Sequence, residues 1–319
     1  MTHTVDARGF LIFGGLFLST RGPLWRNDDA FSEKILAKLS YVLDLAKEER
    51  LVPVITGNVF ARPHESNDAM KTALIRLLNS SWTPALCGIG KNDKSGEHLD
   101  DADSLAVIGE AGALIIANGG AVEAVAVDGD FRLGIGFTHY NSALPAVINQ
   151  GGENVSGVVW IYHRSAAGRQ PQYLPGCNLV VDASNPRETT PVHLRGDGGK
   201  TTVWQSVGAM ARIYEDMAET TPCAWALTKN GFSRRAVPCE SLVPAAGEAR
   251  GVMAVSSQRG GGNFAKALLS IRQGGVEKTS PEYALDLVKK HLAQTGAGEA
   301  ALHLAEKIYA KAILKGKMS

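Results

Sequence analysis

Apolar and polar positions follow two different periods along the first third of the chain. Apolar runs at Phe10–Phe17, Leu51–Ile55 and Pro84–Ile89 have the length of buried strands. Between these runs, apolar residues recur every three to four positions from about Phe31 to Leu43 and from about Asn67 to Leu78. That spacing is typical of amphipathic helices with one buried face. Strands that alternate with helices predict a sheet covered by helices, and hence an α/β fold.

The middle third of the chain, from about Leu105 to Val192, has a different pattern. Short β-like runs separated by Gly-rich breaks replace the helical spacing. They are Ala113–Ala117, Ala121–Val127, Leu133–Phe137, Val158–Tyr162 and Leu179–Val181. We expect these runs to form a second sheet packed on the first, and Val203 to about Val255 to add further strands and turns.

The composition changes again at Gln258-Arg259-Gly260-Gly261-Gly262, a Gly-rich segment typical of a flexible joint. Helical spacing resumes beyond it and runs to residue 319. We therefore predict two regions: an α/β sandwich over residues 1–257 and a helical C-terminal region over residues 258–319.

Charge and cysteine content restrict the functional classes. Lys plus Arg number 33 and Asp plus Glu number 32, so a net charge of +1 gives no global attraction to nucleic acid or to an anionic membrane. No pair among the 4 cysteines has CxxC spacing, which argues against a zinc ribbon or a thioredoxin-like site. The apolar run near the N-terminus is short for a membrane span, and no basic segment precedes it. We expect a cytoplasmic protein (in the host cytoplasm if it is virus-encoded) with reduced thiols.

Motifs of several enzyme classes are missing. The chain has no GxSxG nucleophile elbow, and no GxGxxG follows the first predicted strand. Gly196-Asp197-Gly198-Gly199-Lys200 lacks the full phosphate-loop spacing and is better explained as a tight turn between strands. Acyl transfer and dinucleotide chemistry therefore have no support.

The candidate chemistry lies in five short segments that follow predicted strands. They are Gly14-Gly15-Leu16-Phe17, Thr56-Gly57-Asn58, Gly90-Lys91-Asn92-Asp93, Thr138-His139-Tyr140-Asn141 and Ile161-Tyr162-His163-Arg164-Ser165. These segments resemble the metal-binding motifs of the calcineurin-like metallophosphoesterase family, especially its branch of DNA double-strand-break repair nucleases. The resemblance covers most of the chain and is clearest from the first strand through the third. It implies a four-layer α-β-β-α sandwich with a small C-terminal helical appendage.

In this family, two metal ions held by Asp, His and Asn side chains polarise the phosphoryl group and generate a hydroxide. The resemblance places Gly15 and Phe17 at the Asp and His of the GDxH motif. It places Asn58 at the bridging Asp of the GDxxD motif. Glycine and phenylalanine side chains offer no metal ligand, and an amide is a weak substitute for a bridging carboxylate.

The later motifs are also altered. In the family's GNHD or GNHE motif, Lys91 takes the place of the Asn ligand and Asn92 that of the catalytic His, while Asp93 is retained. His139 matches the first of two later histidine motifs. His163 matches the first His of the GHxH motif, and Ser165 replaces the second. A lysine ammonium at a ligand position repels a dication.

This set of replacements predicts a vestigial site without a metal and a non-catalytic homologue, or pseudoenzyme. The alternative is an active metal-dependent phosphoesterase or nuclease with a rebuilt, reduced site. Such a site would bind Mn²⁺ or another divalent ion through Asp93, His139 and His163. A third interpretation of the two histidines is purely structural, as hydrogen-bonded residues of the core.

A pseudoenzyme keeps its fold for binding. We expect a binding or structural component of a nucleic-acid-processing or virus-encoded assembly, with a protein partner or a second copy of the chain and no membrane. Modest binding of single-stranded nucleic acid is a further expectation. The aromatic residues near the old cleft would either fill it or form a platform with nearby cations; they are Phe17, Trp25, Tyr140 and Tyr162, and the cations are Arg21, Arg26, Arg62 and Lys91.

Overall fold

The computed structural model describes residues 2–23, 25–26, 30–149, 154–164 and 170–239. The chain divides into two compact units, Met1–Ala246 and Gly247–Ser319. The described helices and strands all belong to the first unit. The predicted boundary after residue 257, the helical region 258–319 and Ser165 lie outside the described residues and remain predictions.

The first sheet is built from the strands at the two ends of this unit. Its strands are β2 (Gly9–Phe13), β3 (Leu51–Ile55), β4 (Ala85–Cys87), β5 (Leu114–Ile116), β12 (Cys223–Thr228) and β13 (Gly231–Ala236). Their order across the sheet is β13-β12-β2-β3-β4-β5. Strands β2 to β5 run parallel, whereas β12 is antiparallel to both of its neighbours.

The second sheet comes mainly from the middle of the sequence, as four of the five short β-like runs predict, and β1 joins it from the N-terminal part. The prediction for the fifth run, Ala113–Ala117, was wrong, because this run forms β5 of the first sheet, parallel to β4. Its strands are β1 (His3–Asp6), β6 (Val122–Asp128), β7 (Phe131–Thr138), β8 (Gly157–Tyr162), β9 (Leu179–Asp182), β10 (Val192–Arg195) and β11 (Thr201–Gln205). Their order is β1-β6-β7-β8-β9-β11-β10. The turn at Gly196–Lys200 joins the antiparallel pair β10 and β11, as predicted.

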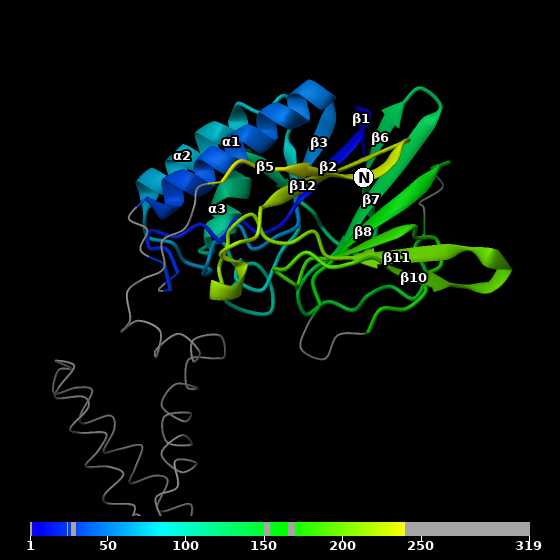
Figure 1. Ribbon diagram of the computed structural model, residues 1–319. Coiled ribbons are helices and arrows are strands. Elements are labelled where there is room, and N and C mark those ends of the chain that lie inside the picture. Colours follow the sequence, from blue (N-terminus) through cyan, green and yellow to red (C-terminus); the bar gives the residue numbers. More distant parts are fainter. Residues whose placement is uncertain (1, 24, 27–29, 150–153, 165–169, 240–319) are drawn as a thin grey trace, which may run out of the picture. The chain divides into compact units, whose positions relative to one another are not determined.

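Three α-helices of the described chain pack against the first sheet: α1 (Phe31–Glu49), α2 (Asp68–Asn79) and α3 (Ser104–Glu110). Figure 1 shows them together on one side of that sheet. The α2 start follows from its cap, because the Asn67 side chain accepts the Met70 amide. None of the described helices has the length and apolar composition that a membrane span requires.

A shared core lies between the two sheets. Phe10, Ile12 and Val54 of the first sheet pack in one cluster with Ile135 and Phe137 of the second. The predicted α/β sandwich of two sheets is therefore confirmed. The outer face of the second sheet differs from the expected helical layer, because loop residues cover it in the described part of the chain: Leu144, Ile148 and Leu174.

Candidate functional site

The five candidate segments meet at one end of the sandwich. Strands β2, β3 and β4 are parallel, so the loops after them emerge at the same edge of the sheet. Phe17 donates its amide to the Asn58 carbonyl at 2.9 Å, and His163 donates its amide to the Thr138 carbonyl at 2.9 Å. Tyr140 donates its amide to the Ile89 carbonyl at 3.1 Å, which joins the third and fourth segments. The family resemblance thus groups segments that the fold places together.

Asp93 is the fully buried centre of this region. Its Oδ2 accepts the amides of Asn58 at 2.6 Å and Gly90 at 2.8 Å. Its Oδ1 accepts the amides of Val59 at 2.8 Å and Phe60 at 3.4 Å. Burial raises the pKa of Asp93 to about 6, although these amides act in the opposite direction. Through these hydrogen bonds, the Asp93 carboxylate holds the loop after β3 against the loop after β4.

Asn58 stands where the family has its bridging carboxylate, and here it shapes the backbone. Its φ of 52° lies in the left-handed region, which asparagine tolerates better than most residues. Its Oδ1 accepts the Asn92 amide at 2.9 Å. A Cβ atom on Gly90 would overlap that oxygen, so glycine is required there. The amide oxygen that could have faced a metal is committed to the neighbouring loop.

His139 has both ring nitrogens engaged. Nδ1 accepts the Ile89 amide at 3.1 Å, so the ring proton resides on Nε2, which donates to the Ala117 carbonyl at 2.8 Å. Burial lowers the pKa of His139, which favours the neutral ring. Neither nitrogen has a lone pair left for a metal.

His163 is also buried and neutral. Its Nε2 lies 2.7 Å from the Thr56 carbonyl oxygen and must donate to it. Burial lowers the pKa of His163 to about 4. A Cβ atom on Gly57 would lie 2.5 Å from Nε2, so this close approach needs a glycine. Through this hydrogen bond, His163 joins the end of β8 to the loop after β3.

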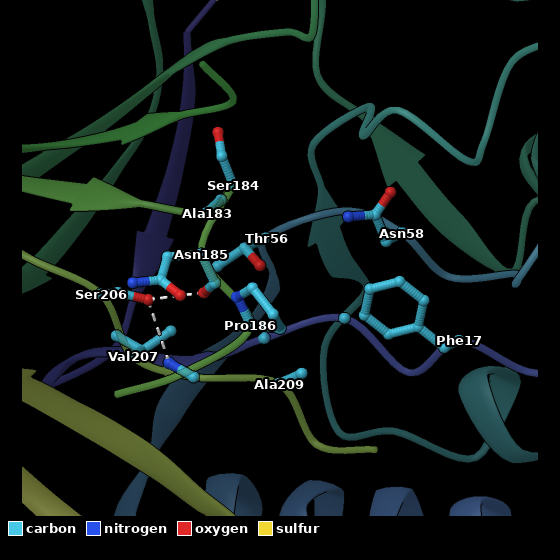
Figure 2. A pocket seen from close by; sticks show the side chains of 13 residues that line it. Phe17, Thr56, Asn58, Ala183, Ser184, Asn185, Pro186, Ser206, Val207 and Ala209 are labelled. Carbon is cyan, nitrogen blue, oxygen red and sulfur yellow. Dashed lines mark hydrogen bonds between the residues drawn. The ribbon is translucent and has the colours of Figure 1, made fainter. Parts of the chain in front are cut away.

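Phe17 occupies the space next to the two replaced ligands. Its φ is 48°, and a Cβ atom on Gly15 would lie 2.7 Å from Phe17 Cε2 and 3.0 Å from Asn58 Cβ. The remaining cleft has a volume of about 20 Å³, which is room for about one water molecule. Figure 2 shows Phe17 and Asn58 on one side of it and Asn185 and Pro186 on the other. The Phe17 ring lines this small cleft together with Gly15 and Asn58.

One wall of this cleft comes from residues 183–186 and from residues 206–209, and the sequence did not single out the second segment. The Ser206 hydroxyl donates to the Asn185 carbonyl at 2.7 Å and accepts the Gly208 amide at 3.3 Å (Figure 2). A serine in a loop carries no signal of such a role. The nearby Asp182–Pro186 segment resembles a degraded asparagine-proline-glycine turn, and residues 183–186 do line the cleft.

Lys91 and Asn92 complete the set of replaced ligands. The Lys91 side chain is exposed, and it forms no ion pair with any of the described residues. Asn92 enters the site through its backbone amide, which Asn58 accepts. An ammonium that replaces a metal charge would be buried among carboxylates, and Lys91 is not.

The donor atoms do not fit a divalent metal. In the described part of the chain, no cluster of three or more His, Cys, Asp or Glu side chains could hold one. The three retained candidates are each engaged within the fold: Asp93 by backbone amides, His139 through both nitrogens, and His163 through Nε2. A metal would have to displace several of these hydrogen bonds.

The aromatic and cationic residues near the cleft do not share one surface. Tyr162 is buried and packs edge-on against Trp204 with ring centroids 6.0 Å apart. Trp25 is buried and donates Nε1 to the Ile213 carbonyl at 3.1 Å. The buried Arg26 guanidinium lies 5.9 Å from the Trp25 ring centroid. These three side chains are unavailable for stacking on a base.

Comparison with known proteins gives likenesses to solved structures but no match to a family model or a curated protein. Among solved structures, the chain is similar to the crystal structure of a 5'-nucleotidase precursor from Thermus thermophilus, with a TM-score of 0.40 and 13% identity. The match covers 78% of this chain and 59% of that one.

Proposed function

We propose that this chain is a non-catalytic homologue of the metallophosphoesterases that acts as a binding or structural component of an assembly. The observation that carries the proposal is the use of Asp93, His139 and His163 as internal fasteners. Each joins loops that a catalytic site would hold around its metals. Asp93 and His139 cannot act as both, because a metal ligand needs a free lone pair and their lone pairs already accept backbone amides. His163 keeps a lone pair on Nδ1, but one histidine alone does not hold the two metals of a catalytic site.

The alternative, an active enzyme with a reduced metal site, faces a cost at each candidate ligand. Metal binding by His139 would break its bond with the Ile89 amide or the Ala117 carbonyl. Ligation by Asp93 would leave backbone amides unsatisfied inside the protein, at about 1–3 kcal/mol for each buried group. The loss accumulates over several groups before any metal–ligand bond is formed.

The deciding experiment combines metal content with turnover. Full-length protein purified without chelators is analysed for Mn, Fe and Zn, and is then assayed for hydrolysis of bis(4-nitrophenyl) phosphate with added Mn²⁺. We expect substoichiometric metal and no turnover above the protein-free rate. Stoichiometric metal, or turnover that His139→Ala abolishes while the exposed His98→Ala does not, would overturn the proposal.

The partner in this proposal is another protein or a second copy of the chain. The near-neutral net charge supports this choice over nucleic acid. Light scattering of the purified chain tests for the second copy. Fluorescence anisotropy with a short labelled single strand at low salt tests for nucleic acid. Binding that Arg62→Ala and Lys91→Ala weaken would move the proposal to a nucleic-acid partner.

A further inference from the structure

A groove opens between the two sheets beside the edge strands β10 and β13, and it is lined by other residues than the cleft near Phe17. Its volume is about 640 Å³, within the range of small-molecule sites. Strands β9, β10 and β11 of the second sheet form one wall, and β12 and β13 of the first form the other. The lining includes Leu179, Glu188, Val203, Gln205, Trp225 and Phe232.

Gln205 points into this groove from β11. Side chains alternate along a strand, so Val203 and Gln205 share the face toward the first sheet, while Trp204 packs in the cluster on the opposite face. The Gln205 residue is only 5% exposed. Its side-chain amide makes no hydrogen bond with a described residue. An amide donor and an amide acceptor are therefore unpaired side by side in a largely apolar groove.

The facing wall carries a stacked pair of aromatic rings. Trp225 and Phe232 stack with ring centroids 4.4 Å apart and an interplanar angle of 18°. Both rings are only partly buried against the inter-sheet core, and Leu179 and Val203 continue the apolar surface across the groove. A planar ligand would find aromatic contact on this side and aliphatic contact on the other.

The groove has no unbalanced positive charge for an anionic ligand. Glu188 is its one carboxylate among the described lining residues. Its Oε2 accepts Arg234 Nε at 3.1 Å and lies 3.4 Å from the Cys223 thiol sulfur that donates to it. The guanidinium is therefore matched by a carboxylate, and a phosphate inside the groove would meet that carboxylate.

We propose that this groove binds a neutral planar heterocycle that carries a hydrogen-bond donor beside an acceptor, which is the chemistry of a nucleobase. Gln205 pairs with the polar edge of the ring, as glutamine amides do with adenine. The stacked pair of Trp225 and Phe232 packs against the ring. The groove shares no residue with the vestigial site, so binding there does not depend on whether the chain hydrolyses phosphoesters.

Equilibrium dialysis of the full-length protein against adenosine, guanosine, cytidine and uridine tests this site, with indole as a ring that lacks the donor–acceptor pair. We expect at least one nucleoside to bind more tightly than indole. Gln205→Met keeps the length of the side chain without its amide and should weaken that binding about tenfold. Gln170→Met, the same change at an exposed position, should leave it unaltered.

If Gln205→Met does not fold, a second variant still tests the proposal. Val203→Phe fills the groove from the same strand and keeps the amide, and it should also abolish binding. A short single-stranded oligonucleotide distinguishes the two sources of the base. If it binds more tightly than its nucleosides and Gln205→Met removes this advantage, the ligand is a nucleic-acid strand. If the affinities are equal, the ligand is a free base or nucleoside. No nucleoside binding at millimolar concentration, or binding equal in Gln205→Met and wild type, would overturn the proposal.

Discussion

Asp93 and His163 should impose opposite pH dependences on stability, and two substitutions separate them. Burial raises the pKa of Asp93 from 3.8 to about 6, so the folded state binds the proton more tightly than the unfolded state. Its contribution is present in full below pH 3.8 and is lost as the pH rises through 6. Burial lowers the pKa of His163 from 6.5 to about 4. Its contribution is present above pH 6.5 and is lost as the pH falls through 4.

The magnitudes follow from proton linkage. Between pH 7 and pH 5, the Asp93 shift adds about 1.3 kcal/mol to the free energy of unfolding. Over the same interval the His163 shift removes about 1.8 kcal/mol. The two terms nearly cancel in the wild-type protein. The lowered pKa of His139 acts in the same direction as that of His163.

The substitutions remove one titrating group each. His163→Gln keeps a donor for the Thr56 carbonyl, and its stability relative to wild type should rise by about 1.8 kcal/mol from pH 7 to pH 5. Asp93→Asn should lose about 1.3 kcal/mol relative to wild type over that interval, beyond a penalty present at every pH for the amides left unpaired. Urea unfolding at pH 5, 6 and 7 measures both differences. A difference that is constant with pH for either variant would refute the assigned origin of its pKa shift.

Three further outcomes follow from the packing of the site. Gly15→Asp should destabilise the protein by about 1–3 kcal/mol, because the new Cβ would meet the Phe17 ring. In urea unfolding, the double variant Gly15→Asp/Phe17→Ala should lose less stability than the two single variants together. Gly90→Ala should lower the free energy of unfolding by a similar ~1–3 kcal/mol, because its Cβ would overlap Asn58 Oδ1. Gly96→Ala is the control and should be near neutral, because its Cβ would meet only the His98 carbonyl oxygen at 4.0 Å. Equal losses in the two variants would contradict this explanation. Millimolar Mn²⁺ should leave the Tm of the wild type unchanged in a thermal scan, and a concentration-dependent rise would show a metal site.

The buried strands and helices were predictable because burial in the core requires apolar residues at regular positions along the chain. The strand Leu51–Ile55 has the predicted bounds, since all five residues are buried and Thr56-Gly57 ends the run. The run from Phe10 was predicted too long: β2 ends at Phe13. The apolar residues that come after it belong to a loop in which Phe17 adopts a left-handed φ, and apolar composition cannot distinguish such a loop from a strand.

Edge strands and loop coverings were harder to predict from the sequence. Strands β1 and β10 are largely exposed, so their residues have no apolar face to reveal them. The cover on the outer face of the second sheet is formed by scattered loop residues such as Leu144 and Ile148, which carry no helical period. The expectation of a helical layer there came from the strand–helix alternation of the first third together with the family resemblance.

In the candidate site, the sequence likewise indicates the side chains but not the backbone groups that they bind. The motif positions from Gly15 to His163 meet because consecutive parallel strands end at one edge. Their partners are backbone amides and carbonyls, which every residue has and no sequence pattern marks. The sequence therefore located the loops of the candidate site, and only the structure gives the hydrogen bonds that occupy Asp93, His139 and His163.

The replaced ligands are interlocked, which bears on how the site could change. A carboxylate at position 15 requires Phe17 to move, because the ring occupies the space of its Cβ. A carboxylate at position 58 could still accept from Asn92, but it would place a second acid next to the buried Asp93. Each single reversion toward a metal site therefore costs stability before the others are present.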